Sequence, residues 1–192
     1  MIHLALGFLC QFLNNELNQK LGLSPATESV KTGPLGKETT ADNKIHLTLI
    51  HIEEENILKN QNYYRKADPA SDFYTVINPE IKINLYILFS ALFDAAAYTE
   101  ALRQVSFIMS ILQGKNTFGQ ADLTGEASVL ESLMVELHTQ TIEQENLFWI
   151  SAGHSPVPSV MYKVRLLLIQ DDRMLDQVRE VTGIGIDLIN KM

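Results

Sequence analysis

The chain contains five histidines and one cysteine, and their positions limit the chemistry that it could perform. None of the histidines stands at a metal-binding spacing such as His-Glu-x-x-His, and a single cysteine cannot build a zinc-binding cluster. The histidines are His3, His46, His51, His138 and His154. We therefore expect no metal and no cofactor.

Other catalytic motifs are missing from the sequence as well. It has no Gly-x-Ser-x-Gly nucleophile elbow and no Walker A loop, and Gly183-x-Gly185 lies in a tail where it opens no helix. The run Glu53-Glu54-Glu55 could suggest paired carboxylates, but consecutive residues at the end of a strand point to opposite faces and stay solvated. These patterns argue against an enzyme.

Composition bounds the fold and the partners. With 192 residues and 46% apolar content, the chain can bury one substantial core. Its 23 acidic and 15 basic residues give a net charge of -8, which repels a phosphate backbone, and no basic patch offsets that charge. Lys163 and Arg165 alternate with apolar residues and are expected to face an acidic neighbouring strand near Glu136. Nucleic-acid binding is therefore disfavoured.

The N-terminal stretch Met1 to Leu13 is apolar but is neither a signal peptide nor a membrane anchor in this interpretation. It lacks a basic segment and a cleavage site, and it is shorter than the roughly 20 residues that span a bilayer. Cys10 in this stretch is expected to be a small core residue. We expect the chain to fold in the bacterial cytoplasm without direct membrane insertion.

Apolar periodicity predicts three helices, and capping residues mark their ends. The first spans 2–21 and stops at Gly22. The second follows Asp94, ends at Gly114 and is expected to bury Tyr98, Leu102, Val105, Ile108, Met109 and Leu112. The third spans 142–152 between Thr141 and Gly153 and is expected to point Ile142, Asn146, Trp149 and Ile150 one way. Trp149 is there either a core anchor or an interface anchor.

Alternation of apolar and polar residues predicts four strands, at 44–49, 81–90, 129–139 and after Pro158 to Leu168. A phase change at 50–52 indicates a bulge or burial on both faces. The expected fold is α+β, with a mostly antiparallel four-stranded sheet packed with helices and long loops at 24–42 and 56–78. A short strand is expected near Val30. The predicted domain covers 1–172, and 173–192 is an extended C-terminal tail.

Two segments are candidates for contacts between subunits. Residues 56–78 show no sustained period, and their aromatic residues form either a protein-contact surface or local packing; these are Tyr63, Tyr64, Phe73 and Tyr74. The tail alternates Ile184, Ile186 and Leu188, so it either pairs as a strand with another chain or packs as an amphipathic helix on its own subunit.

The order of segments resembles a family encoded in contractile-injection loci, which includes the terminators of the virulence-cassette and antifeeding-prophage particles. The resemblance covers about Met1 to Asp172 and rests on six blocks in order. They are Met1-Ile2 with 12–18 (FLNNELN), 43–55 (NKIHLTLIHIEEE), 83–91 (INLYILFSA), 98–102 (YTEAL) with 113–115 (QGK), 145–149 (ENLFW) and 158–165 (PSVMYKVR).

The resemblance implies a structural cap that closes the distal end of an inner tube, stops its polymerisation and joins the end of the sheath. It implies a homo-oligomer, typically a hexameric ring, with the inner-tube protein and the sheath protein as partners. In such a particle the tail is expected to add to a sheet of a neighbouring cap or sheath subunit, so that truncation after Asp172 leaves the domain folded. The alternatives are another component of the same particle, such as a baseplate subunit or tube initiator, and a small ligand-binding module near Trp149.

Overall fold

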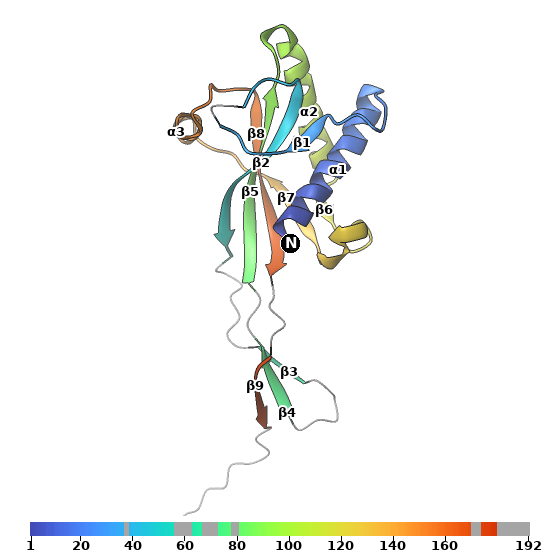
Figure 1. Ribbon diagram of the computed structural model, residues 1–192, viewed down its shortest axis with the longest axis vertical. Helices are drawn as coiled ribbons and strands as arrows, with labels where there is room; N and C mark the ends of the chain where they lie inside the picture. Colours follow the sequence, from blue (N-terminus) through green and yellow to red (C-terminus); the bar gives the residue numbers. More distant parts are fainter. Residues whose placement is uncertain (37–38, 56–62, 67–72, 78–80, 170–173, 180–192) are drawn as a thin grey trace, which may run out of the picture. The chain divides into compact units, whose positions relative to one another are not determined.

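The computed structural model describes residues 1–36, 39–55, 63–66, 73–77, 81–169 and 174–179 (Figure 1). The chain divides into two compact units. The first comprises residues 1–55 and 82–168, and the second comprises 56–81 and 169–192. The predicted boundary at residue 172 falls outside the described residues.

The first unit is an α+β structure with a six-stranded mixed sheet in the order β1-β2-β5-β8-β7-β6. Its strands are β1 (Val30–Thr32), β2 (Lys44–Glu54), β5 (Ile81–Leu92), β6 (Thr117–Phe118), β7 (Leu133–Leu137) and β8 (Ser159–Ile169). Its helical elements are α1 (Ile2–Leu21), η1 (Ala95–Ala97), α2 (Tyr98–Gly114), η2 (Gly125–Val129) and α3 (Ile142–Ala152). The three predicted helices are thus present.

The sheet corrects the prediction of four strands. The four predicted strands form its centre, as β2, β5, β8 and β7, and β1 and β6 are added at the two edges. β1 has three residues and pairs with β2 in parallel, whereas β6 has two residues and pairs with β7 in antiparallel. β1 was expected only as a short strand near Val30, and β6 was missed because two residues cannot display a period.

α1 covers the sheet with one apolar stripe, as its three- to four-residue spacing predicts. Leu9, Leu13 and Leu17 on this stripe are fully buried. The helix ends at Gly22, whose φ of 67° is the left-handed conformation that favours glycine. Phe8 and Phe12 extend the contact, because both rings pack edge-on against Phe118 of β6.

Two asparagines on α1 fix the segment that leads into β1. The Asn14 side chain donates to the Val30 carbonyl over 2.7 Å and accepts the backbone N–H groups of Ser29 and Val30, both over 2.8 Å. One turn later, buried Asn18 donates to the Thr27 carbonyl over 2.5 Å and accepts the Ser29 hydroxyl over 2.6 Å. These amides supply the partners that the buried backbone there needs.

α2 buries a different stripe from the predicted one. Val105, Ile108 and Leu112 are buried as expected, but Tyr98, Leu102 and Met109 are exposed. Ala101, Gln104 and Ile111 are buried in their place. The apolar arc of α2 is wider than the surface that α1 and β2 offer it, and periodicity alone does not give the centre of the buried arc.

β5 is the centre of the core. Leu85, Ile87 and Phe89 are fully buried on one side of the strand, and Leu88 and Ser90 are buried on the other. The prediction that this strand is central near Leu88 is therefore confirmed.

The second unit contains a three-stranded antiparallel sheet in the order β3-β4-β9. Its strands are β3 (Tyr63–Lys66), β4 (Phe73–Ile77) and β9 (Met174–Arg179). Two predictions need correction. The segment 56–78 does contain strands, and the first residues of the predicted tail form β9, which pairs with β4 of the same chain.

We predict that Asn18→Leu lowers the free energy of unfolding by about 2 kcal/mol, because it leaves the Thr27 carbonyl and the Ser29 hydroxyl buried without their partner. Urea denaturation measures the effect. Asn15→Leu is the matched control, because Asn15 is exposed on the same helix. Equal losses in both variants would contradict the role given to Asn18.

Candidate functional site

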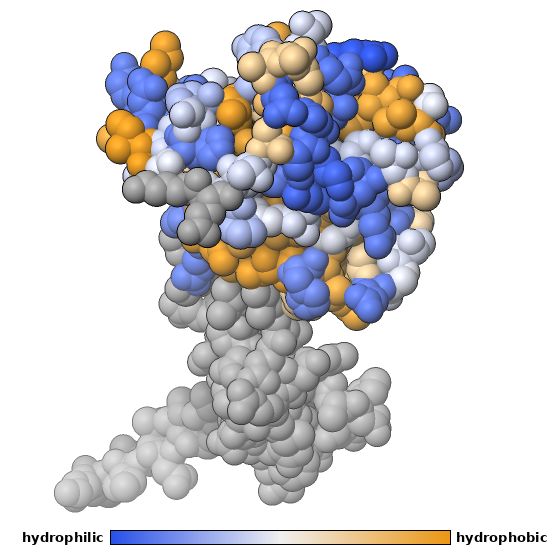
Figure 2. Space-filling view, turned by 45° about the horizontal axis from the view of Figure 1, so that its top comes forward, coloured by the Kyte–Doolittle hydropathy of each residue, from blue (hydrophilic) through white to orange (hydrophobic). Residues whose placement is uncertain are grey.

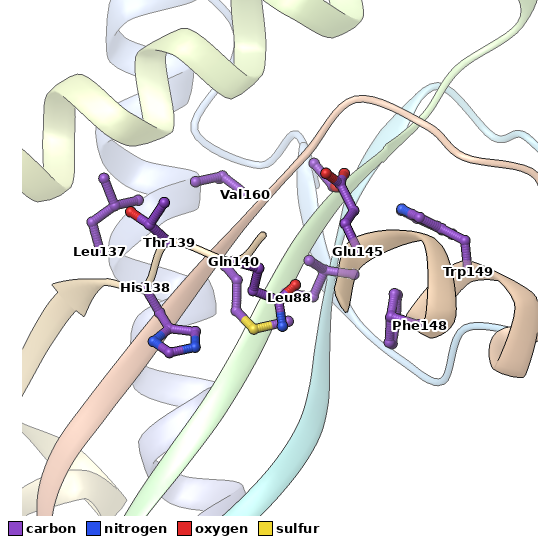
Figure 3. Close-up of a pocket in the computed structure, with 11 residues that line it drawn as sticks. Leu88, Leu137, His138, Thr139, Gln140, Glu145, Phe148, Trp149 and Val160 are labelled. Atoms are coloured by element: carbon purple, nitrogen blue, oxygen red, sulfur yellow. The ribbon is translucent and has the colours of Figure 1, made fainter. Parts of the chain in front are cut away.

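The candidate site is the face of the six-stranded sheet opposite α1 and α2, called here the open face. Figure 3 shows α1 and α2 behind the sheet and the side chains of the open face in front of it. α3 packs on one end of this face, and polar and aromatic side chains from β2, β5 and β8 occupy the rest. The open face is therefore the part of the first unit that its two long helices leave available.

α3 is short, and its ends are defined by the sequence. Thr141 and Gln144 form a reciprocal capping box: the Gln144 N–H donates to Thr141 Oγ1 over 3.3 Å, and the Thr141 N–H donates to Gln144 Oε1 over 3.1 Å. Gly153 ends the helix with a φ of 66°. The predicted cap and stop are both confirmed.

Trp149 anchors α3 to the sheet. Its side chain is 2% exposed and packs in a cluster with Leu88 of β5 and Met161 of β8. Ile142 and Ile150, which were expected to point the same way as Trp149, are instead 75% exposed. The helix has one fully buried anchor, and its exposed surface combines aliphatic with charged and polar side chains. An 11-residue helix that packs mainly through Trp149 and Phe148 cannot bury a whole apolar stripe.

A cavity of about 180 Å³ lies between α3 and the sheet. Leu137 and His138 line one side of it and Glu145, Phe148 and Trp149 line the other, with Leu88 between them (Figure 3). Pockets for small molecules typically enclose about 300–1,000 Å³, so this cavity is small for a cofactor. A second hollow of about 490 Å³ is lined by residues of one segment, 146–156, and is a groove on the surface of α3.

A β-bulge decides which side chains reach the open face. The register between β2 and β5 shifts between Leu49 and His51, so that His51 lies opposite Tyr86 and Glu53 lies opposite Asn84. The phase change at 50–52 is thus a bulge, one of the two predicted outcomes. Without it, the alternation of β2 would turn these two side chains to the other face.

Glu53, near the end of β2, joins three strands of the open face. Its carboxylate accepts the Tyr86 hydroxyl over 2.8 Å and pairs with the Lys163 ammonium over 3.0 Å. Lys163 also lies over the Tyr86 ring, and His138 packs edge-on against that ring. On β7 and β8, Arg165 pairs with Glu136 over 2.9 Å, which confirms the predicted acidic neighbour.

These contacts shift the ionisation of both partners. Hydrogen bonds from Tyr86 and then from Lys163 lower the pKa of Glu53. Burial acts to lower the pKa of Lys163, but its interactions with Glu53 and Tyr86 outweigh burial and raise it. The pair therefore stays ionised. Glu53 is 45% exposed near the end of β2, as expected of a solvated strand end, but it also bonds to Tyr86 and Lys163, which the sequence did not predict. The bulge was the sequence signal that could have placed Glu53 beside Tyr86.

One buried cluster has the residue types of a hydrolase triad. Asp42 contacts His46 over 2.9 Å, and His46 lies opposite Ser90 in the register of β2 and β5. Ser90 and His46 are both buried, and neither the Ser90 hydroxyl nor His46 Nδ1 has a hydrogen-bond partner. A nucleophile needs a base within hydrogen-bond reach and access for a substrate, and this cluster offers neither. We assign it to the core.

Within the described residues, no three side chains of the metal-binding types gather closely enough to hold an ion. No helix in the described part of the chain combines the length and apolar character needed to cross a membrane.

Comparison with protein families matches residues 8–182 to the model of the Pvc16 N-terminal domain. The chain belongs to this family. Two solved structures share the fold of this Pvc16 N-terminal domain. One is the sheath/tube terminator of PVC, an extracellular contractile injection system, in the extended state; the TM-score is 0.61 at 14% identity, over 94% of this chain and 63% of that one.

The other is the tube-terminating cap of the anti-feeding prophage, with a TM-score of 0.59 at 18% identity, over 91% of this chain and 59% of that one. The chain therefore spans about three fifths of the length of either protein. No curated protein sequence matches it.

The residues predicted to form contacts between subunits lie in both units. Tyr63 and Tyr64 are on β3, and Phe73 and Tyr74 are on β4, so the structure brings these four into one small sheet. Trp149 is buried within its own subunit and could act on a partner only by holding α3 in place. Ile184, Ile186 and Leu188 lie outside the described residues.

We predict that Glu53 stabilises the fold above the ordinary pKa of a glutamate and that this contribution disappears as the pH falls through the lowered pKa of Glu53. Urea midpoints measured from pH 7 to pH 3 should fall more steeply for the wild type than for Glu53→Gln. Parallel curves would contradict the network. Glu126→Gln, at an exposed glutamate, is the control.

Proposed function

We propose that this chain is the tube-terminating cap of a phage-tail-like contractile injection particle. The observation that carries the proposal is its fold, which two proteins described as a sheath/tube terminator and a tube-terminating cap share over more than nine tenths of this chain. The family match over residues 8–182 supports the same conclusion.

A terminator acts through its shape. It presents one surface that fits the last ring of a polymer and offers no copy of the surface that would receive another ring, so that growth ends. Such a role needs stable, specific contacts and no reacting group. We propose that the open face, with its two ion pairs, and the exposed side of α3 supply such contacts.

We propose further that the cap is a homo-oligomer, a hexameric ring, at the distal end of the particle, with the inner-tube protein on one side and the sheath protein on the other. A ring matches the cyclic symmetry that a tube end presents, since each subunit then contacts an equivalent site. Whether the particle is released or anchored does not alter this geometry.

The C-terminal tail is proposed to make a contact with a neighbouring cap or sheath subunit. Its alternating Ile184, Ile186 and Leu188 suit a strand that adds to a sheet edge through main-chain hydrogen bonds, with three side chains that set the register. Because β9 pairs with β4, a test must keep residues up to 180, and the truncation after Asp172 considered from the sequence would also remove β9.

We predict that a strain lacking this gene makes tubes and sheaths of irregular length, and that a plasmid copy of the full chain restores uniform length. Electron microscopy of purified particles gives the length distributions. A plasmid copy ending at residue 180 should restore tube length but leave the sheath end loosely attached, so that sheaths separate from tubes under mild shear.

Uniform particles in the deletion strain would contradict the proposed function. Sheaths that hold as firmly with the truncated copy as with the full chain would contradict only the role of the tail.

A further inference from the structure

α3 is held on the sheet by fewer buried residues than the other two helices of the first unit. α1 buries five residues and α2 buries six, whereas α3 buries only Trp149. The Trp149 ring packs against Leu88 of β5 and Met161 of β8, and Phe148 is partly buried at the edge of the same cluster. The free energy that docks α3 on the sheet therefore comes mainly from one aromatic ring.

The packing of Trp149 is incomplete. Its indole Nε1 is buried and has no hydrogen-bond partner in the part of the chain that the structure describes. A donor in that state has given up its bond to water and gained none in return, so docking is unfavourable at this atom. The cavity of about 180 Å³ between α3 and the sheet also removes van der Waals contacts that a closely packed helix would make.

The outer surface of α3 gains nothing from docking. Ile142 and Ile150 are 75% exposed and Leu147 is 64% exposed. Figure 2 shows apolar surface at the left of the view, on the side where α3 lies in Figure 1. Residues 139–141 and 153–157 connect α3 to β7 and β8 and lie outside both strands. The helix can therefore move on these connections while β7 and β8 stay paired.

We propose that α3 is a lid on the open face. It opens as a unit, at a free energy well below that of global unfolding, and uncovers the apolar side chains of Leu88 and Met161. Such local opening is expected of an element with few buried apolar contacts. The sheet stays folded meanwhile, because its other side keeps the cover of α1 and α2 over Leu85, Ile87 and Phe89.

The lid goes beyond the proposed function, because a cap with an immobile α3 could end a tube equally well. What the lid adds is a second state of the open face, in which an apolar patch on β5 and β8 replaces the docked helix. A partner that binds this patch would have to displace Trp149 first, so the docked helix restricts access to the patch.

Thiol labelling measures the opening. In a Cys10→Ser background, Met161→Cys places a buried thiol under the lid, and Leu13→Cys places one under α1 as the control. A methanethiosulfonate reagent is used at concentrations where the labelling rate stays proportional to reagent. Met161→Cys should react at least about tenfold faster than the global unfolding of that variant allows, as measured by urea denaturation, whereas Leu13→Cys should react only through global unfolding.

A second substitution in each labelled chain identifies the opening. Ile108→Val on α2 weakens the part of the unit that stays folded when the lid opens. It should raise the labelling rate of Leu13→Cys about fivefold and leave that of Met161→Cys unchanged. Trp149→Ala removes the ring that docks the lid, so it should raise the labelling rate of Met161→Cys at least about tenfold.

Three outcomes would overturn the proposal. If Ile108→Val speeds the labelling of both thiols equally, the Met161 position is exposed only by global unfolding. If Trp149→Ala leaves the labelling of Met161→Cys unchanged, the reagent enters through the cavity and not past a moving helix. If Trp149→Ala alone, in the otherwise unchanged chain, loses the circular dichroism of α1 and α2, then α3 belongs to the cooperative core and is not a lid.

Discussion

Burial of β5 on both sides is the constraint from which the rest of the first unit follows. Phe89 and its neighbours on one side of the strand need the cover that α1 and α2 provide, and Leu88 on the other side needs a separate cover. If either side of a strand at the centre of a six-stranded sheet were exposed to solvent, the strand would lose a large part of the stabilisation that comes from burying its apolar side chains. α3 answers the second need with Trp149, and Phe148 of the same helix packs against the edge of that cluster.

Because α3 packs on the sheet only through Trp149 and Phe148, the helix covers the open face only in part. The rest of that face carries polar, charged and aromatic side chains, of which Asn84 and Ser90 are buried and Glu53 and Tyr86 are partly exposed. The bulge in β2 brings Glu53 into reach of Tyr86 and Lys163, so a single extra residue in a strand determines the composition of the surface. The same limited seating leaves Ile142 and Ile150 exposed. The core and the exposed surface of α3 thus have one origin.

Long periodic elements could be predicted from the sequence, and the reasons are physical. Leu9, Leu13 and Leu17 repeat over a 20-residue helix, and Gly22 and Gly153 stop helices because glycine tolerates a positive φ. β6 and the exact buried arc of α2 could not be predicted, since two residues carry no period and a wide apolar arc has no unique centre. The partners of Glu53 could not be predicted because they come from β5 and β8, and only the register between strands reveals such a contact.

The resemblance to the contractile-injection family rested on six short blocks in order, and the family match over residues 8–182 confirms it. No single block carried chemistry of its own. Several belong to the elements that build the core: the first lies on α1, the third on β5 and the last on β8. The family is therefore recognised through packing rather than through a reacting site, which agrees with the proposed function, since a terminator would act by shape.

The position of the chain in the assembled particle tests the central claim most directly. Cryo-electron microscopy of particles that carry a gold-labelled or enlarged copy of this chain would locate it. The account predicts extra density at one end of the particle only, opposite the baseplate, on the last ring of tube and sheath. Density along the sheath or at the baseplate would contradict the assignment of this chain as the terminating cap.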